Sequence, residues 1–190
     1  MKLSKVVFLD RDGVINQDSP EYIKHPSEFH FIPGSRRAVA RLNRYGFHII
    51  VITNQSIIGR NMVTPQTLDR IFIKMTQGIE AAGGRILDIF FCPHTPDEGC
   101  DCRKPRAGLI FQAQSRYDID LSRSVFVGDS VKDIEVARNA GCGSAVLVAT
   151  GNGTRAFQEL TARGTPPDYF AENLMASAHW ITRQPRQPDA

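Results

Sequence analysis

The 190-residue sequence lacks the features typical of membrane, secreted and nucleic-acid-binding proteins. No stretch approaches the roughly 18 consecutive apolar residues that cross a bilayer, and no apolar signal-peptide core follows Met1. The 23 basic and 20 acidic residues are scattered, so the net charge of +3 is too weak a field to indicate nucleic acid. The chain is therefore expected to be cytoplasmic, with no membrane or nucleic-acid partner. It is also expected to be a monomer, because no exposed apolar stripe calls for a protein partner.

Cysteine is also scarce, and its placement favours a metal site over a disulfide framework. Only 4 cysteines are present, and Cys92, Cys100 and Cys102 lie in one short segment beside His94. Such crowding favours metal binding. Cys142 lies apart from them, after a helix-ending glycine, and is expected to be a small buried apolar residue.

The chain has no composition break, internal repeat or low-complexity segment, so we expect one domain over residues 1–182. Residues 183–190 have no large apolar side chain to bury and predict a disordered tail.

Short apolar runs alternate with segments of helical periodicity, which is typical of an α/β fold with a doubly wound, mainly parallel sheet. The expected strands cover residues 6–9, 47–52, 86–91, 124–127 and 144–148. The expected helices cover about 35–45, 65–82, 108–117, 132–140 and 173–182. In such a sheet ligands bind at the carboxyl ends of the strands, so the polar residues that follow each strand are the candidates for a site.

Two carboxylates follow the first expected strand, Asp10 and Asp12. Residues two apart in an extended chain face the same side, so these carboxylates repel unless they share a proton or a cation such as Mg²⁺. Asp10 can then attack phosphorus as a nucleophile, while Asp12 protonates the leaving oxygen and later activates water. The alternative is an Asp-rich turn that caps a helix.

Two later segments could hold a phosphate group. The residues after the second strand offer hydroxyls and backbone N–H groups to phosphoryl oxygens, unless they form an ordinary polar turn: Thr53, Asn54, Gln55 and Ser56. Arg103 and Lys104 follow the cysteine segment and could clamp a phosphate, or could simply be solvated.

Carboxylates also follow the fourth expected strand, after Gly128. Asp129 would complete a Mg²⁺ site with Asp10 and Asp12. Asp133 either binds the metal through water or stabilises the N-terminus of the next helix.

The cysteine segment predicts a structural zinc site. Cys92, His94, Cys100 and Cys102 form a C-x-H and a C-x-C pair, and four such ligands suit a closed tetrahedral Zn²⁺ site. The ion would order the loop and hold Arg103 and Lys104 in place. The alternatives are a reduced loop without metal and a Cys100–Cys102 bridge.

Taken together, these segments resemble the phosphatases of the haloacid-dehalogenase-like (HAD) superfamily. Residues 10–14, D-R-D-G-V, resemble the D-x-D-G-[TV] signature, and residues 128–133 resemble the G-D-x-x-x-D motif. The resemblance implies a Rossmann-like sheet and Mg²⁺-dependent hydrolysis of a phosphomonoester through a phosphoaspartate on Asp10. It also implies that Asp129 and the backbone carbonyl of Asp12 complete the metal site. No cap insertion follows Asp12 or Thr53.

Within the superfamily, the D-R-D-G start, the zinc loop that runs into C-R-K-P and the missing cap resemble the heptose-1,7-bisphosphate 7-phosphatases. That resemblance implies a small phosphorylated sugar as substrate, contacted by Asp18 and Tyr22, and a role in surface-polysaccharide synthesis. Histidinol-phosphate phosphatases are similar over the same motifs and are the alternative. Two further alternatives are a nucleic-acid 3′-phosphatase, disfavoured by the scattered charge, and a non-enzymatic zinc-binding module, disfavoured because every chemical position holds a competent residue.

Overall fold

The computed structural model of the chain describes residues 3–184, which fold around a six-stranded sheet. The strand order is β3-β2-β1-β4-β5-β6, and every neighbouring pair is parallel. The strands are β1 (Val6–Leu9), β2 (His48–Asn54), β3 (Asp88–Cys92), β4 (Val125–Gly128), β5 (Ser144–Val148) and β6 (Tyr169–Ala171). The expected doubly wound parallel sheet is therefore confirmed. The winding direction reverses between β1 and β4, which is where ligands bind in folds of this kind.

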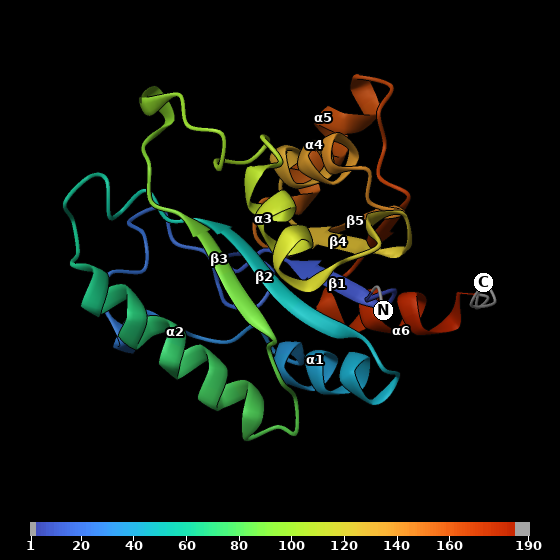
Figure 1. Cartoon of the computed structure of the whole chain (residues 1–190), viewed down its shortest axis with the longest axis horizontal. Helices are drawn as coiled ribbons and strands as arrows, with labels where there is room; N and C mark the ends of the chain where they lie inside the picture. The colour runs from blue at the N-terminus through green and yellow to red at the C-terminus, as the bar shows by residue number, and fades with distance from the viewer. Residues whose placement is uncertain (1–2, 185–190) are drawn as a thin grey trace.

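Six helices cover the sheet within the described residues, three on each face (Figure 1). One face carries α1 (Ser35–Arg44), α2 (Pro65–Glu80) and α6 (Leu174–Arg183). The other carries α3 (Gly108–Tyr117), α4 (Val131–Ala140) and α5 (Gly153–Ala162).

Two hydrophobic clusters hold these layers together, because alternate side chains of each strand point to opposite faces. Val7 and Leu9 of β1 belong to the cluster under α1, α2 and α6. Val6 and Phe8 belong to the cluster under α3, α4 and α5. The central strand is buried on both faces, which fixes the position of the residues that follow it.

The expected strands and helices are all present, with ends shifted by one or two residues. The sequence interpretation missed α5, whose N-cap Asn152 makes no side-chain capping bond, and β6, which has only 3 residues. It also missed three short 3-10 turns, Pro26–Glu28, Pro96–Glu98 and Leu121–Arg123. The last helix runs through Arg183, so the tail begins later than expected, and the rest of it, residues 185–190, lies outside the described part of the chain.

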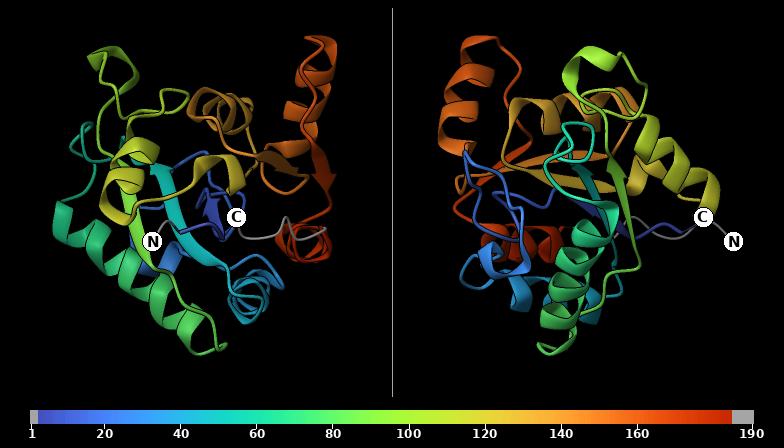
Figure 2. Two further views of the ribbon diagram at one scale, coloured as in Figure 1. Left: turned by 45° about the vertical axis from the view of Figure 1, so that its right-hand side comes forward. Right: turned by 90° about the vertical axis from the view of Figure 1, so that its left-hand side faces the viewer.

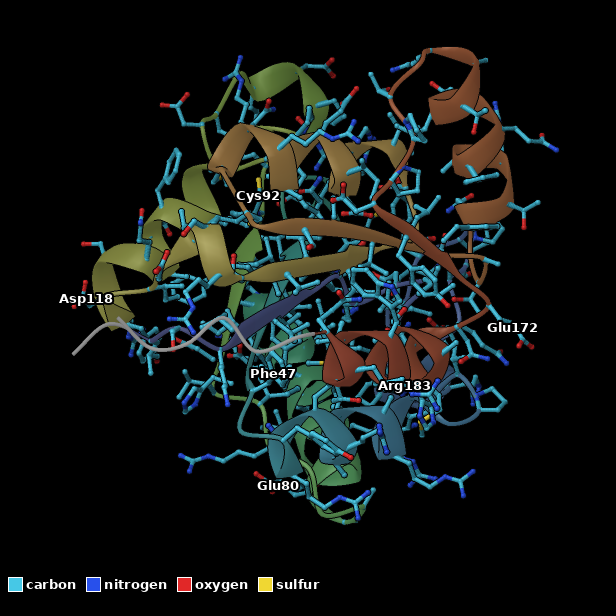
Figure 3. All side chains as sticks on the ribbon, turned by 90° about the vertical axis from the view of Figure 1, so that its right-hand side faces the viewer. Phe47, Glu80, Cys92, Asp118, Glu172 and Arg183 are labelled. Carbon is cyan, nitrogen blue, oxygen red and sulfur yellow. The ribbon has the colours of Figure 1, made fainter. Side chains whose placement is uncertain are left out.

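The segment between β3 and α3 projects from the body of the domain at the carboxyl ends of the strands (Figures 1 and 2). Cys92, labelled in Figure 3, lies at the root of this segment on the α3 side of the sheet. Between β1 and α1 the structure has turns, isolated β-bridges and the 3-10 turn Pro26–Glu28, and between β2 and α2 it has turns and bends. Residues 3–184 therefore contain no large cap domain. Over the same range, every helix is too short or too polar to cross a membrane.

Candidate active site

The ends of β1, β2 and β4 bring three of the predicted segments together. Because β1 lies between the other two, Asp10 lies between the residues that follow β2 and those that follow β4. The Asp10 amide donates to the carbonyl of Val127 at 3.0 Å, which extends the β1–β4 pairing to the first catalytic candidate. Carboxylate oxygens of Asp10, Asp129 and Asp133 all lie within 4.8 Å of one another.

This carboxylate cluster is strongly perturbed. Burial, with the negative charges of Asp133 and Asp12, raises the pKa of Asp10 from 3.8 to about 7 against the opposing effect of Lys104. Burial, together with Asp133 and Asp10, raises the pKa of Asp129 to about 8. Three crowded carboxylates call for a cation, and a cluster of hard oxygen donors fits Mg²⁺.

Lys104 is the protein's own counter-charge to the carboxylate cluster. It is only 4% exposed, and its Nζ lies 2.9 Å from Asp10 Oδ1 and 2.6 Å from Asp133 Oδ1. Burial opposes its charge, but the two carboxylates outweigh burial and raise the pKa of Lys104. The Asn54 side chain exchanges two hydrogen bonds with the Lys104 backbone, at 3.1 and 3.3 Å. The Asn54 side chain therefore positions this lysine.

Asp12 is held away from this lysine by a different cation. The guanidinium of Arg11, 1% exposed, donates from Nη2 to Asp12 Oδ1 at 2.7 Å and from Nε to Oδ2 at 3.1 Å. Asn16 and Gln55 add side-chain bonds to the same carboxylate at 2.9 and 3.1 Å. Burial would raise the pKa of Asp12, but Arg11 and the other donors lower it. The neighbouring carboxylates of Asp10 and Asp12 are thus shifted in opposite directions.

Gln55 and Thr53, predicted to contact phosphate, are linked to Asp12 and to each other. The Gln55 amide donates to Thr53 Oγ1 at 2.9 Å as well as to Asp12. Both side chains are buried, and Ser56 is buried beside them. The turn after β2 is therefore a connected part of the site rather than an ordinary solvated turn.

Asp133 stabilises the N-terminus of α4, one of the two roles that its position allowed, and also lies within the carboxylate cluster. Its Oδ2 accepts from the amides of Asp129 and Ser130 at 3.2 and 3.0 Å, which caps α4. Its Oδ1 binds Lys104, and it lies within the carboxylate cluster. Gly128 is required here, because a Cβ at that position would lie 2.1 Å from the Asp133 Cβ.

Asp18 and Tyr22, predicted to contact the substrate, lie near Asp12. Both line one small pocket with Asp12 and Gln55. Tyr22 has a φ of 62°, a left-handed backbone that is uncommon for a bulky residue.

Arg103 donates from Nη1 to the carbonyl of His94 at 3.0 Å, so this cation is tied to the cysteine segment.

The predicted zinc ligands form one compact group. Ligand atoms of Cys92, His94, Cys100 and Cys102 all lie within 4.8 Å of one another. The Cys102 Sγ lies 3.2 Å from both Cys92 Sγ and His94 Nδ1. The Cys100 and Cys102 sulfurs are 3.5 Å apart and both cysteines are free, so the alternative of a bridge between them is not observed. Three thiolates and one imidazole fit a closed Zn²⁺ site.

Three functional candidates were missed by the sequence interpretation: Arg11, Asn16 and the loop after β5. The role of Arg11 depends on its guanidinium folding back onto the adjacent carboxylate, which residue spacing does not reveal. The loop did carry a signal, because T-G-N-G at residues 150–153 is a glycine-rich turn at the carboxyl end of a parallel strand. Its Asn152 amide donates to Asp129 Oδ2 at 2.8 Å.

Comparison with known proteins points to one group. The family model described as HAD-hydrolase-like matches residues 101–177. D-glycero-beta-D-manno-heptose-1,7-bisphosphate 7-phosphatase of Bordetella bronchiseptica is 43% identical over 182 residues, covering 95% of this chain and 99% of that protein. The protein of the same name from Neisseria meningitidis serogroup A is 41% identical, covering 98% and 99%. The crystal structure of the B. bronchiseptica D,D-heptose 1,7-bisphosphate phosphatase with magnesium and phosphate superposes with a TM-score of 0.88 at 40% identity, covering 95% of this chain and 99% of that one.

Proposed function

The chain belongs to the family of the D-glycero-D-manno-heptose-1,7-bisphosphate 7-phosphatases, and on that premise we propose that it hydrolyses the 7-phosphate of the β anomer of this sugar. The observation that carries the proposal is the set of strand-end carboxylates around Lys104, in which Asp10 and Asp12 are held by different cations. One carboxylate is thereby available as nucleophile and the other as acid and base.

The reaction takes two steps. The Asp10 carboxylate attacks phosphorus, the bond between phosphorus and the C7 oxygen breaks, and Asp12 gives its proton to that oxygen. The negative phosphate that arrives beside Asp12 raises its affinity for this proton, against the opposing effect of Arg11. Asp12 then takes a proton from water, the water oxygen attacks the phosphoaspartate, and inorganic phosphate leaves with Asp10 restored.

The charge of the transferring group is met by the residues around it. Lys104 Nζ is already 2.9 Å from Asp10, and the Thr53 hydroxyl and Asn54 amide belong to the last two residues of the neighbouring strand β2. Mg²⁺ held by Asp10, Asp129 and the Asp12 carbonyl would neutralise phosphoryl oxygens. Arg103, Asp18 and Tyr22 are proposed to orient the sugar.

The family to which the chain belongs supports a heptose bisphosphate as the substrate, rather than histidinol phosphate. Both relatives described above carry the β-heptose name, and the chain covers nearly their whole length. We also propose that residues 1–182 form a single domain and that the protein is a cytoplasmic monomer with no nucleic-acid partner. Size-exclusion chromatography with light scattering tests whether it is a monomer.

The deciding experiment compares kcat/KM for the α and β anomers of heptose 1,7-bisphosphate with that for histidinol phosphate, at saturating Mg²⁺ and with the zinc content measured. We expect the β bisphosphate to be preferred over histidinol phosphate by about a hundredfold or more, roughly 2.7 kcal/mol of transition-state discrimination. Asp10→Asn, purified in the same way, controls for contaminating phosphatases. A preference for histidinol phosphate would contradict the sugar assignment and leave the roles of Asp10 and Asp12 open to the same tests.

A further inference from the structure

The loop that connects β5 to α5, residues 149–152, presses against the catalytic turn of β1. The Thr150 hydroxyl donates to the carbonyl of Gly13 at 2.6 Å. The Asn152 amide donates to Asp129 Oδ2 at 2.8 Å. This segment, the β5–α5 loop, therefore contacts both the turn after Asp10 and the candidate metal ligand that follows β4.

Gly151 shows how close this approach is. Its φ is +61°, and a Cβ at this position would lie 2.1 Å from Asp129 Oδ2 and 2.7 Å from the Gly13 Cα. Only glycine allows the β5–α5 loop to come this near, since any side chain would displace the carboxylate or the turn. The Asp129 side chain, 3% exposed, is confined between two glycine backbones.

The Asn152 side chain extends the contact to the rim of the site. Its Nδ2 lies 3.1 Å from Asp18 Oδ2 and 3.4 Å from Asp129 Oδ2. Asp18 belongs to the segment after β1 that lines the small pocket with Tyr22 and Asp12. One asparagine thus contacts a candidate metal ligand through its backbone and a candidate substrate residue through its side chain.

We propose that the β5–α5 loop is a positioning element of the active site. Its backbone, at Gly151 and Asn152, fixes the Asp129 carboxylate for Mg²⁺, and the Asn152 side chain fixes the Asp18 segment for the substrate. The second part rests on the proposed function, whereas the first requires only that the cluster binds Mg²⁺. A ligand held in one orientation binds its ion without a reorganisation cost, which is the physical basis of both parts.

Gly151→Ala tests the backbone part, with Gly164→Ala as the matched control. Both glycines have left-handed backbones, with φ of +61° and +69°, but a Cβ at Gly164 meets nothing within 4 Å. The two variants share the conformational cost, and only the first displaces Asp129. Isothermal titration calorimetry should show Mg²⁺ binding about ten- to a hundredfold weaker in Gly151→Ala. Gly164→Ala should bind Mg²⁺ within about twofold of wild type.

Thr150→Val gives a milder version if Gly151→Ala folds poorly by circular dichroism. It removes the bond to the Gly13 carbonyl at nearly constant volume, and should weaken Mg²⁺ binding in the same direction by roughly two- to fivefold. The backbone part would be overturned if folded Gly151→Ala and Thr150→Val both bound Mg²⁺ as tightly as wild type. It would also be overturned if Gly164→Ala lost as much Mg²⁺ affinity as Gly151→Ala.

Asn152→Ala tests the side-chain part. It keeps the backbone amide bond to Asp129 at 2.8 Å, and loses the side-chain bond to Asp18 together with the long 3.4 Å side-chain contact to Asp129. We expect Mg²⁺ binding to stay within about twofold of wild type and KM for the sugar bisphosphate to rise roughly three- to tenfold, with kcat within about twofold. Asn43→Ala is the control: its side chain also joins two segments, at Phe47 and Arg85, far from the strand carboxyl ends. It should leave KM unchanged.

A double-mutant cycle then asks whether Asn152 acts through Asp18. If it does, Asn152→Ala combined with Asp18→Ala should have the same KM as Asp18→Ala alone. Additive increases, or no increase in Asn152→Ala, would overturn the side-chain part. Parallel assays with 4-nitrophenyl phosphate, which lacks the sugar hydroxyls that Asp18 is proposed to contact, should show little change in KM for Asn152→Ala. The calorimetric measurement of Mg²⁺ binding needs no substrate, so it tests the backbone part even if the sugar assignment fails.

Discussion

The two candidate metal clusters of this protein are built in opposite ways. Asp10 follows β1, whereas Asp129 and Asp133 both follow β4, so these carboxylates meet only because β1 and β4 are neighbours. The zinc ligands all come from the single segment Cys92–Cys102, which projects beyond the sheet (Figure 2). The first cluster forms only when the whole sheet is folded, whereas the ligands of the second are brought together within one short segment.

The clusters also differ in how their charges are balanced. In the carboxylate cluster, the negative charges of Asp10, Asp129 and Asp133 repel one another. Among the described residues, Lys104 is the only cation that pairs with both Asp10 and Asp133. The zinc segment has little regular structure of its own, only the turn Pro96–Glu98. Its order therefore depends on the ion far more than the order of the core does. A substitution in the first cluster should remove the chemistry directly and spare the fold. A substitution in the second should disorder its own segment and lower activity through the residues that this segment holds.

Asp10→Asn should have the largest effect. Asparagine cannot form the phosphoaspartate, so kcat should fall by about 10⁴-fold or more. The change also removes one of three crowded carboxylates, so thermal unfolding of the metal-free protein should occur at the same temperature or higher. Steady-state kinetics and calorimetric melting check both points. Activity above about 1% of wild type would exclude Asp10 as the nucleophile.

Loss of the zinc site should have an intermediate effect. Cys100→Ser removes one ligand, and we expect the zinc content to fall and kcat/KM to drop roughly ten- to a hundredfold, because Arg103 is tied to His94. Far-UV circular dichroism should remain near wild type, since most of the core lies in the layers around the sheet.

Cys142→Ser is the matched control for the zinc variant. Cys142 is outside the Cys/His group, so this change should leave the zinc content and kcat/KM unaltered. Full activity in a zinc-free Cys100→Ser protein would show that the ion does not hold the phosphate-binding residues.

The difference between the clusters also explains what could be predicted from the sequence. Cysteine and histidine spacing predicts the zinc ligands directly, because all four lie in one segment. The carboxylates required a topology as well, and that followed from strands that alternate with helices. Their assignment as catalytic residues remains a prediction, although the structure brings Asp10, Asp12, Thr53, Lys104 and Asp129 to one end of the sheet.

What the sequence could not reveal are contacts that arise only when distant segments meet. The T-G-N-G turn places Asn152 at the carboxyl end of a strand, but its contacts with Asp129 and Asp18 arise only once β5 and α5 have positioned it. The short edge strand β6 escaped detection for a related reason. Its pairing with β5, and not its three residues, makes it a strand.

The smallest effect we predict is on the pH dependence of stability, and it is specific to the carboxylate cluster. The folded protein raises the pKa of Asp10 to about 7 and that of Asp129 to about 8, from 3.8. The folded state therefore binds these protons more tightly than the unfolded state does. Their contribution to stability is complete below about pH 4 and is lost as pH rises through 7 and 8. Mg²⁺ requires the ionised carboxylates, so its stabilising effect should grow over the same range.

Paired melting curves with saturating Mg²⁺ and without added Mg²⁺, on protein of equal zinc content at pH 5.5 and pH 8, measure this difference. Groups that do not contact Mg²⁺ contribute equally to both curves of a pair. At a hundred times its dissociation constant Mg²⁺ adds about 2.7 kcal/mol, or roughly 5 to 11 °C for a chain of this length. We expect that shift at pH 8 and only a degree or two at pH 5.5. The carboxylate cluster would not be the Mg²⁺ site if the shift were equal at both pH values, or if Asp129→Asn kept the full shift at pH 8.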